Sequence, residues 1–192
     1  MDLKGKKHEN LTIEVITGEA IEQCRELCNE LMAFQKSKAH FHPESFDRMN
    51  FDTRMKKSYE GALDSHIAVV KDKGIPVGYV FSTVDMVTEE AKNMIADWAP
   101  PGSKGFYPEW FKVPQKVGCI SNLYLREQYR NLGLGEALFK LAMEWLESIP
   151  DMEANFVYVS NGNDDAMKFY LNHGYTPSHE VYGGFINALQ KK

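Results

Sequence analysis

The stretch RNLGLGEALF, residues 130–139, decides the fold of this chain. Gly133 and Gly135 stand one residue apart, after an apolar run typical of a strand and directly before an apolar pattern at helical spacing. The first turn of a helix carries unpaired N–H groups and a partial positive charge, and glycines allow an anion to come close to them. The unit therefore predicts either a phosphate cradle or a bare turn in which the glycines serve geometry alone.

Two familiar phosphate loops do not fit these residues. A dinucleotide fingerprint needs a third glycine, and Leu138 stands at its place. A P-loop needs Gly-Lys-Ser/Thr, which does not follow here. The spacing Arg130-x-x-Gly133-x-Gly135 suits the pyrophosphate of coenzyme A, with Arg130 adding positive charge at the rim.

A second motif lies further along the chain, in NGNDDAMKFYLNHGY, residues 161–175. Together with the glycine loop, it resembles the GNAT superfamily (GCN5-related N-acetyltransferases). The first family signature, Gln/Arg-x-x-Gly-x-Gly/Ala, is met by Arg130, Gly133 and Gly135. The second, Asn-x-x-Ala-x-x-Phe-Tyr-x-x-x-Gly-Phe/Tyr, is met by Asn163, Ala166, Phe169, Tyr170, Gly174 and Tyr175. The resemblance covers residues 118–176, and the segments before them match the family's layout only coarsely.

The resemblance implies an acetyl-CoA-dependent N-acetyltransferase and a place for its donor. In the family, the strand before the loop splays from its neighbour and pairs with the pantetheine arm, which implicates the main chains of Leu123, Tyr124 and Leu125. Asn163 matches a residue that touches the cofactor, and Tyr170 matches a tyrosine near the thioester sulfur, the general acid. The pyrophosphate is expected on the amides of Arg130, Asn131, Leu132, Gly133, Leu134 and Gly135.

The general base is not evident from the sequence. Many relatives carry a glutamate on the strand before the glycine loop, but residues 118–125 read GCISNLYL and contain no carboxylate. Either a carboxylate comes from elsewhere or a chain of waters removes the proton, with Ser121 or Asn122 able to hold a water. Four carboxylates are candidates by position only, each more simply read as a solvated charge: Glu44, Asp47, Asp85 and Glu180.

Periodicity along the chain predicts one α/β domain. It is expected to be a GNAT-type domain, with a mixed and mostly antiparallel sheet of six to seven strands flanked by about four helices. Residues 1–10 are predicted to be a flexible leader, and 11–192 the domain, with its CoA-binding core at about 118–176. Strands are predicted over 11–17, 66–70, 77–84, 119–125, 155–160 and twice within 175–189; helices over 19–34, after residue 42, within 88–98, after residue 133 and over 164–172.

Composition restricts the partners. The 192 residues carry a net charge of −5, which argues against nucleic acid and leans weakly toward a cationic acceptor. Three cysteines, no signal peptide and no membrane-length apolar run predict a cytoplasmic protein without a membrane partner. Cys24 and Cys28 are expected to be core residues, and His40 and His42 to line the acceptor site. No metal is expected, although each of these pairs has a spacing compatible with one.

The predicted function is transfer of an acetyl group from acetyl-CoA to a primary amine of a small molecule or peptide, by direct attack in a ternary complex. A polyamine or aminoglycoside acetyltransferase is the narrower alternative, and a CoA-binding regulatory protein without turnover is the rival from another class. A homodimer is expected from the resemblance alone. Five aromatic residues of the loop 86–117 form either a lid over the acceptor or a part of the core: Trp98, Phe106, Tyr107, Trp110 and Phe111.

Overall fold

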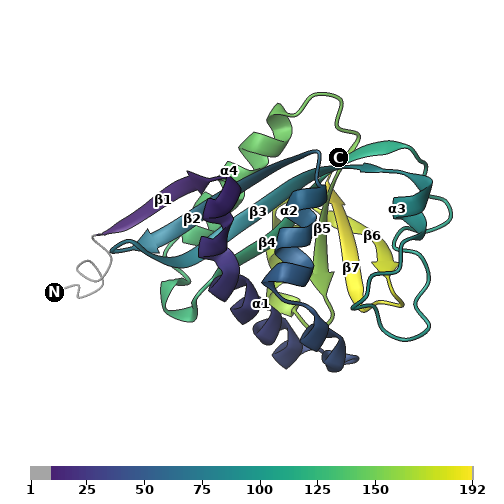
Figure 1. The fold of residues 1–192 in the computed structure, drawn as a ribbon, viewed down its shortest axis with the longest axis horizontal. Helices are drawn as coiled ribbons and strands as arrows, with labels where there is room; N and C mark the ends of the chain where they lie inside the picture. Colours follow the sequence, from purple (N-terminus) through teal and green to yellow (C-terminus); the bar gives the residue numbers. More distant parts are fainter. Residues whose placement is uncertain (1–9, 192) are drawn as a thin grey trace.

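A seven-stranded sheet forms the centre of the protein, and the computed structural model describes residues 10–191 (Figure 1). The predicted leader lies almost wholly outside the described residues. The strand order is β1-β2-β3-β4-β5-β7-β6, and every neighbouring pair is antiparallel except β4 and β5. The predicted mixed, mostly antiparallel sheet is therefore confirmed. The strands are β1 (Leu11–Ile16), β2 (Asp64–Asp72), β3 (Ile75–Val87), β4 (Gln115–Leu125), β5 (Ala154–Ser160), β6 (Thr176–Val181) and β7 (Ile186–Lys191).

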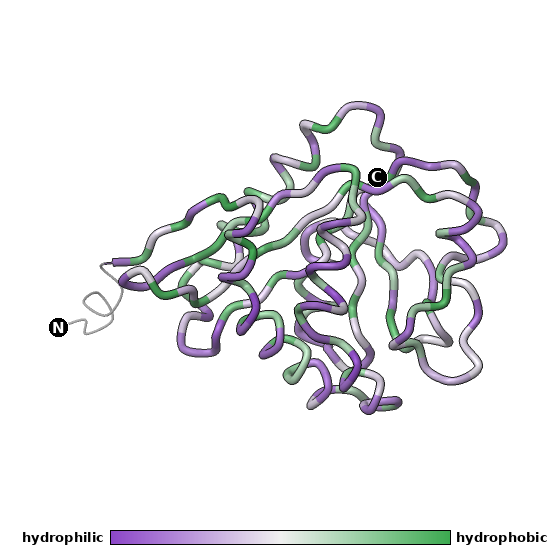
Figure 2. Tube along the Cα trace, in the orientation of Figure 1, coloured by the Kyte–Doolittle hydropathy of each residue, from purple (hydrophilic) through white to green (hydrophobic). Residues whose placement is uncertain are grey.

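Helices cover both faces of the sheet, and alternation along the strands assigns each face its core. Ile67 and Val69 of β2 pack with α1, whereas Ala68 and Val70 pack with α4. Figure 1 shows α1 and α2 in front of the sheet, and in Figure 2 the trace of the central strands is mostly apolar. The helices are α1 (Arg25–Lys38), α2 (Lys57–Gly61), α3 (Glu89–Asn93), α4 (Leu134–Ser148) and α5 (Asp164–Asn172).

The first helical region differs from its prediction in where the α-helix begins. Residues Gly18–Cys24 form a 3₁₀ turn, η1, and α1 then continues to Lys38, four residues beyond the predicted end. The apolar face is nevertheless as predicted, because Cys24 and Cys28 are fully buried among the core residues of this side. Burial raises the pKa of Cys24 to about 12, so this thiol is neutral and packs as a small hydrophobe.

The second predicted helix is broken into three short pieces. A 3₁₀ turn, η2 (Pro43–Arg48), is followed by a π-helical turn, η3 (Phe51–Lys56), and then by α2. The break falls at Asn50, whose extended backbone and side chain cap η3 through the Thr53 amide. The residues predicted to point inward are buried all the same: Phe46, Met49 and Met55.

The later elements follow their predictions closely. Helix α5 has the predicted bounds, and Gly174, with φ +84°, ends it. The tail forms the predicted hairpin of β6 and β7 around Gly183 and Gly184. Helix α3 is shorter than predicted, and residues 94–114 form the long loop expected from their aromatic and proline content.

Candidate functional site

Strand β4 separates from β5 in the middle of the sheet. The two strands pair from Val117 opposite Ala154 to Ile120 opposite Val157, and the pairing ends there. On its other side β4 stays paired with β3 as far as Leu125. The edge of β4 that faces away from β3 is therefore free of strand partners over the last residues, which include Leu123, Tyr124 and Leu125. Such an edge offers main-chain donors and acceptors to an extended ligand.

The glycine loop lies where this free edge ends. Asn131 and Gly133 take left-handed backbone conformations, with φ of +60° and +78°, and Gly133 is the N-cap of α4. The Ala137 amide donates to Gly133 O at 3.1 Å. Within residues 10–191, the amides from Asn131 to Glu136 donate no hydrogen bond. This turn presents a row of unsatisfied donors at the positive end of α4.

Gly135 has no conformational reason to be glycine. Its φ is not left-handed, and a Cβ built on it would meet only Leu125 Cδ1, at an ordinary 3.8 Å. The protein itself would accept a side chain here. The described chain therefore gives no steric or conformational reason for a glycine at this position.

Arg130 holds the loop against the sheet. Its Nε donates to Leu125 O at 2.9 Å, and its guanidinium lies 5.0 Å from the ring centroid of Phe34 and 5.7 Å from that of Tyr124. The side chain therefore fixes the end of β4 to the loop, and its terminal nitrogens have no protein acceptor among the described residues. Arg130 was expected only to add positive charge at the rim of the loop; its hydrogen bond to Leu125 O was not predicted from the sequence.

Tyr170 comes from α5 and packs in the core on the α4 side of the sheet, with Ile120 of β4 and Val157 of β5. It is 8% exposed, and no acceptor lies within hydrogen-bond distance of its hydroxyl among the described residues. Burial raises its pKa above the usual value, and the Cys119 thiol of β4 raises it further. The phenol is thus protonated, and it lies close to Cys119 in the central part of β4.

Asn163 begins α5, and its neighbours hold the end of β5 to α1. The Asn163 side chain accepts from the Ala166 amide at 3.3 Å, which makes it a helix cap with a free amide nitrogen. The buried side chain of Asn161 accepts from the backbone N–H groups of His40 (2.7 Å) and Phe41 (3.1 Å). Sequence reasoning missed Asn161, although its place directly after a buried strand was a usable signal.

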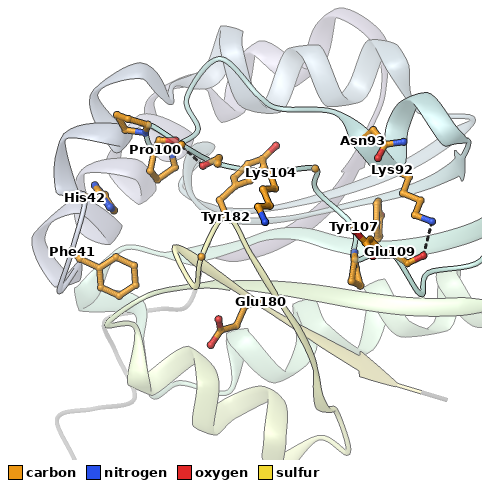
Figure 3. A pocket seen from close by; sticks show the side chains of 16 residues that line it. Phe41, His42, Lys92, Asn93, Pro100, Lys104, Tyr107, Glu109, Glu180 and Tyr182 are labelled. Atoms are coloured by element: carbon orange, nitrogen blue, oxygen red, sulfur yellow. Dashed lines mark hydrogen bonds between the residues drawn. The ribbon is translucent and has the colours of Figure 1, made fainter.

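A hollow of about 650 Å³ opens beside the sheet, between the loop after α1, the loop 94–114 and the turn between β6 and β7. Figure 3 shows Phe41 and His42 on one side and Lys92 and Tyr107 on the other, with Glu180 below. His42 therefore lines a hollow, whereas His40 is held to the Asn161 side chain through its backbone N–H; the expected place of both histidines in an acceptor site stays a prediction.

The five loop aromatics divide between the two predicted roles. Trp98 and Phe111 are buried, and Phe106 packs edge-on against Tyr158, so these belong to the core. Trp110 is 64% exposed. Tyr107 does both: it lines the hollow, and its hydroxyl lies 3.0 Å from that of Tyr158 on β5.

The four candidate carboxylates lie in very different surroundings. Glu44 is exposed and pairs with His42 at 3.1 Å, and Asp47 is exposed and pairs with Lys36 at 2.5 Å. Glu180 is exposed at the hollow. Asp85 alone of the four is partly buried, and it accepts a hydrogen bond from Thr83 Oγ1 at 2.8 Å.

No metal cluster is formed by the residues that the structure describes: nowhere among them do three or more His, Cys, Asp or Glu side chains gather to hold an ion. No described helix is long and apolar enough to cross a membrane.

Comparison with known proteins places these features in a family. The family described as "Acetyltransferase (GNAT) family" matches residues 23–175. No curated protein matches the sequence. Solved structures share the fold at low identity, over nearly the whole of both chains. A PaiA N-acetyltransferase from Thermoplasma acidophilum in complex with coenzyme A has 15% identity and a TM-score of 0.60, covering 94% of this chain and 99% of its own. Arabidopsis thaliana Naa50 with the bisubstrate analogue CoA-Ac-MVNAL has 13% identity and a TM-score of 0.58, covering 95% and 99%.

Proposed function

We propose, from the premise that this chain belongs to the acetyltransferase (GNAT) family, that it transfers the acetyl group of acetyl-CoA to a primary amine of a small molecule or peptide in a ternary complex. Membership of the family confirms the resemblance read from the two motifs. One observation carries the proposal: a row of unsatisfied amides at the N-terminus of α4 adjoins an unpaired edge of β4, with Tyr170 beside that strand.

The donor is proposed to lie along β4 and end on the glycine loop. Within Leu123–Leu125, the main-chain groups that β4 turns away from β3 suit the amides of a pantetheine arm, which itself has donors and acceptors; Leu125 O is excepted, because it accepts from Arg130. The amides of Asn131 to Gly135 suit the pyrophosphate, because they are unsatisfied and lie at the positive end of a helix. Asn163 is proposed to add a contact from α5 through its side-chain nitrogen, which makes no hydrogen bond with any residue that the structure describes.

The chemistry needs a neutral amine and a stabilised thiolate. An alkyl ammonium has a pKa of about 10.4, so freeing the amine at pH 7 costs about 4–5 kcal/mol. The amine nitrogen attacks the thioester carbonyl, whose oxygen a main-chain N–H of β4 polarises. Tyr170 then donates its proton to the leaving sulfur. Burial raises the pKa of Tyr170, which keeps the phenol protonated before the attack and also makes it a weaker acid.

The acceptor is proposed to enter through the hollow next to the 94–114 loop. Naa50 was solved with a CoA–peptide conjugate, and the NatC complex with a peptide and CoA, so related folds take peptide amines. The net charge of −5 favours a cationic acceptor, which keeps a polyamine or aminoglycoside as the narrower alternative. The hollow itself is lined by charges of both signs: Lys92, Lys104, Glu109 and Glu180. The lack of a β4 carboxylate keeps a CoA-binding protein without turnover as the rival.

An amine panel separates these possibilities. Free CoA thiol is measured after mixing the protein with acetyl-CoA and, in turn, a polyamine, an aminoglycoside and short peptides with free N-termini. The proposal expects amine-dependent CoA release well above the release with water alone. Tight binding of acetyl-CoA without release, across the whole panel, would favour the rival.

A further inference from the structure

A line of polar side chains crosses the reaction face of the sheet from β4 to β3. Thr83 Oγ1 donates to Asp85 Oδ2 at 2.8 Å, and it lies 3.4 Å from Ser121 Oγ. Thr83 has a single hydroxyl proton, which is used in the hydrogen bond to Asp85. Thr83 can therefore only accept from Ser121. The Ser121 hydroxyl also donates to Cys119 Sγ at 3.7 Å, so its proton must turn from Cys119 to Thr83 for the line to run from β4 toward the carboxylate.

The backbone places Ser121 at the start of this line. The pairing of β3 with β4 steps from Phe81 opposite Asn122 to Ser82 opposite Ile120, so Ser121 is the extra residue of a β-bulge. Bulges redirect one side chain away from the regular pleat and are frequent next to active sites. This one falls where β4 leaves β5, at the point where the thioester is proposed to lie.

Asp85 at the other end has no cation to balance it. It forms no ion pair with any described residue, and the titratable groups that sense its charge are the thiol of Cys119 on β4, the phenol of Tyr158 on β5 and the phenol of Tyr107 from the loop 94–114. All three are neutral at physiological pH because burial raises their pKa values. Burying a carboxylate without a counter-ion costs folding free energy, and carboxylates in such surroundings are found most often at functional sites.

We infer that Ser121, Thr83 and Asp85 form the relay that removes the proton of the attacking amine, with Asp85 as its final acceptor. This rests on the proposed function. The C–N bond forms as the C–S bond breaks, and the electron pair leaves with sulfur, which takes the Tyr170 proton. The amine proton passes through a water to Ser121, whose own proton moves to Thr83 and that of Thr83 to Asp85. Solvent then takes the proton from Asp85 and restores the one on Tyr170.

The relay explains how the chain works without a carboxylate on β4. Cys119 interacts with both Tyr170 and Asp85. Its thiol is close enough to raise the pKa of Tyr170, and Asp85 is close enough to raise the pKa of Cys119. The acid and the acceptor therefore face the same short section of β4 from different sides. A long 3.4 Å contact before substrate arrives is normal for catalytic hydrogen bonds, which tighten in the complex.

Single substitutions in the relay test it by steady-state kinetics with an amine that the natural chain acetylates. Asp85→Asn and Thr83→Val should each lower kcat about 100-fold at neutral pH, the usual contribution of proton transfer. Calorimetry should show an acetyl-CoA affinity within about twofold of that of the natural chain, because neither side chain belongs to the proposed acetyl-CoA site on β4 and the glycine loop. Thr83→Ser, which keeps the hydroxyl, should recover most of the rate lost in Thr83→Val. Asp64→Asn on β2 removes the same charge from an exposed position and should leave kcat unchanged.

Two further readouts distinguish a relay from a merely structural role. The double variant Asp85→Asn, Thr83→Val should be about as slow as either single one, because both interrupt one path. The acid limb of the kcat/KM profile should vanish in Asp85→Asn. Unchanged kcat in Asp85→Asn, equal loss in Thr83→Val and Thr83→Ser, or multiplicative losses in the double variant would overturn the relay. Amine-dependent CoA release by the natural chain tests the proposed function, and the ratios among variants test the relay, so each can fail separately.

Discussion

Gly135→Ala separates the needs of the ligand from the needs of the fold. The added Cβ would lie 3.8 Å from Leu125 Cδ1, with no other non-neighbouring atom within 4 Å, so the free protein accommodates it. Alanine is also a better helix residue than glycine, by up to about 1 kcal/mol in a helix interior. The unfolding free energy should therefore be unchanged or slightly increased.

The same methyl group should weaken donor binding. It would stand among the amides that are proposed to hold the pyrophosphate, and hydrogen bonds to a charged group contribute about 1.5–3 kcal/mol each. Loss of one such bond corresponds to a roughly 10- to 100-fold larger dissociation constant. Calorimetry with CoA measures this affinity, and thermal unfolding of the free protein measures the stability.

Gly61→Ala and Gly133→Ala serve as controls. Gly61 ends α2 with open space around it, so alanine there should change neither quantity much. Gly133 has φ +78°, and alanine should lower stability by about 1–2 kcal/mol through backbone strain. If Gly135→Ala binds CoA as tightly as the natural chain does, the loop is not the pyrophosphate seat.

Other substitutions examine the remaining parts of the account. Tyr170→Phe should lower kcat about 100-fold while calorimetry shows little change in acetyl-CoA affinity, and an unchanged kcat would remove Tyr170 from the chemistry. Gly162→Ala should destabilise the protein in urea by more than Gly74→Ala does. Both glycines have left-handed φ, but only at Gly162 would the added Cβ overlap the Lys38 carbonyl oxygen, so equal losses would contradict that close approach. Burial raises the pKa of Asp85, so folding disfavours its ionised form, and stability from the protonated form is lost as pH rises through that pKa. Asp85→Asn should thus melt higher than the natural chain at neutral pH, with the difference shrinking on acidification; a constant difference would count against that cause.

The two motifs were enough to predict the fold because together they indicate a strand, a loop and two helices in a fixed order. Short apolar runs at residues 66–70 and 77–84 then predicted strands β2 and β3, since both faces of these strands are buried, each against a different layer. The break at Asn50 was not predictable from periodicity. The buried residues Phe46 and Met55 have a spacing compatible with one helix, although the backbone between them is 3₁₀, then extended, then π-helical.

The donor side of the site was likewise readable, because main-chain groups at a strand edge and a helix end depend on spacing alone. The proton acceptor was not. Asp85 is 36 residues before Ser121 in the sequence, and only the register of β3 and β4 brings Thr83 between them. A bulge one residue away would direct Ser121 elsewhere. Contacts of this kind depend on strand register, which a single sequence specifies only weakly.

The central claim is that an acetyl group passes from CoA to an amine on this protein. Its most direct test is to measure free CoA thiol and the acetylated amine, by mass spectrometry, in the same reaction. Acetyl transfer should give equal amounts of the two products, and both should fall together in Tyr170→Phe. CoA released without an acetylated amine, or acetyl-CoA bound with neither product formed, would contradict it.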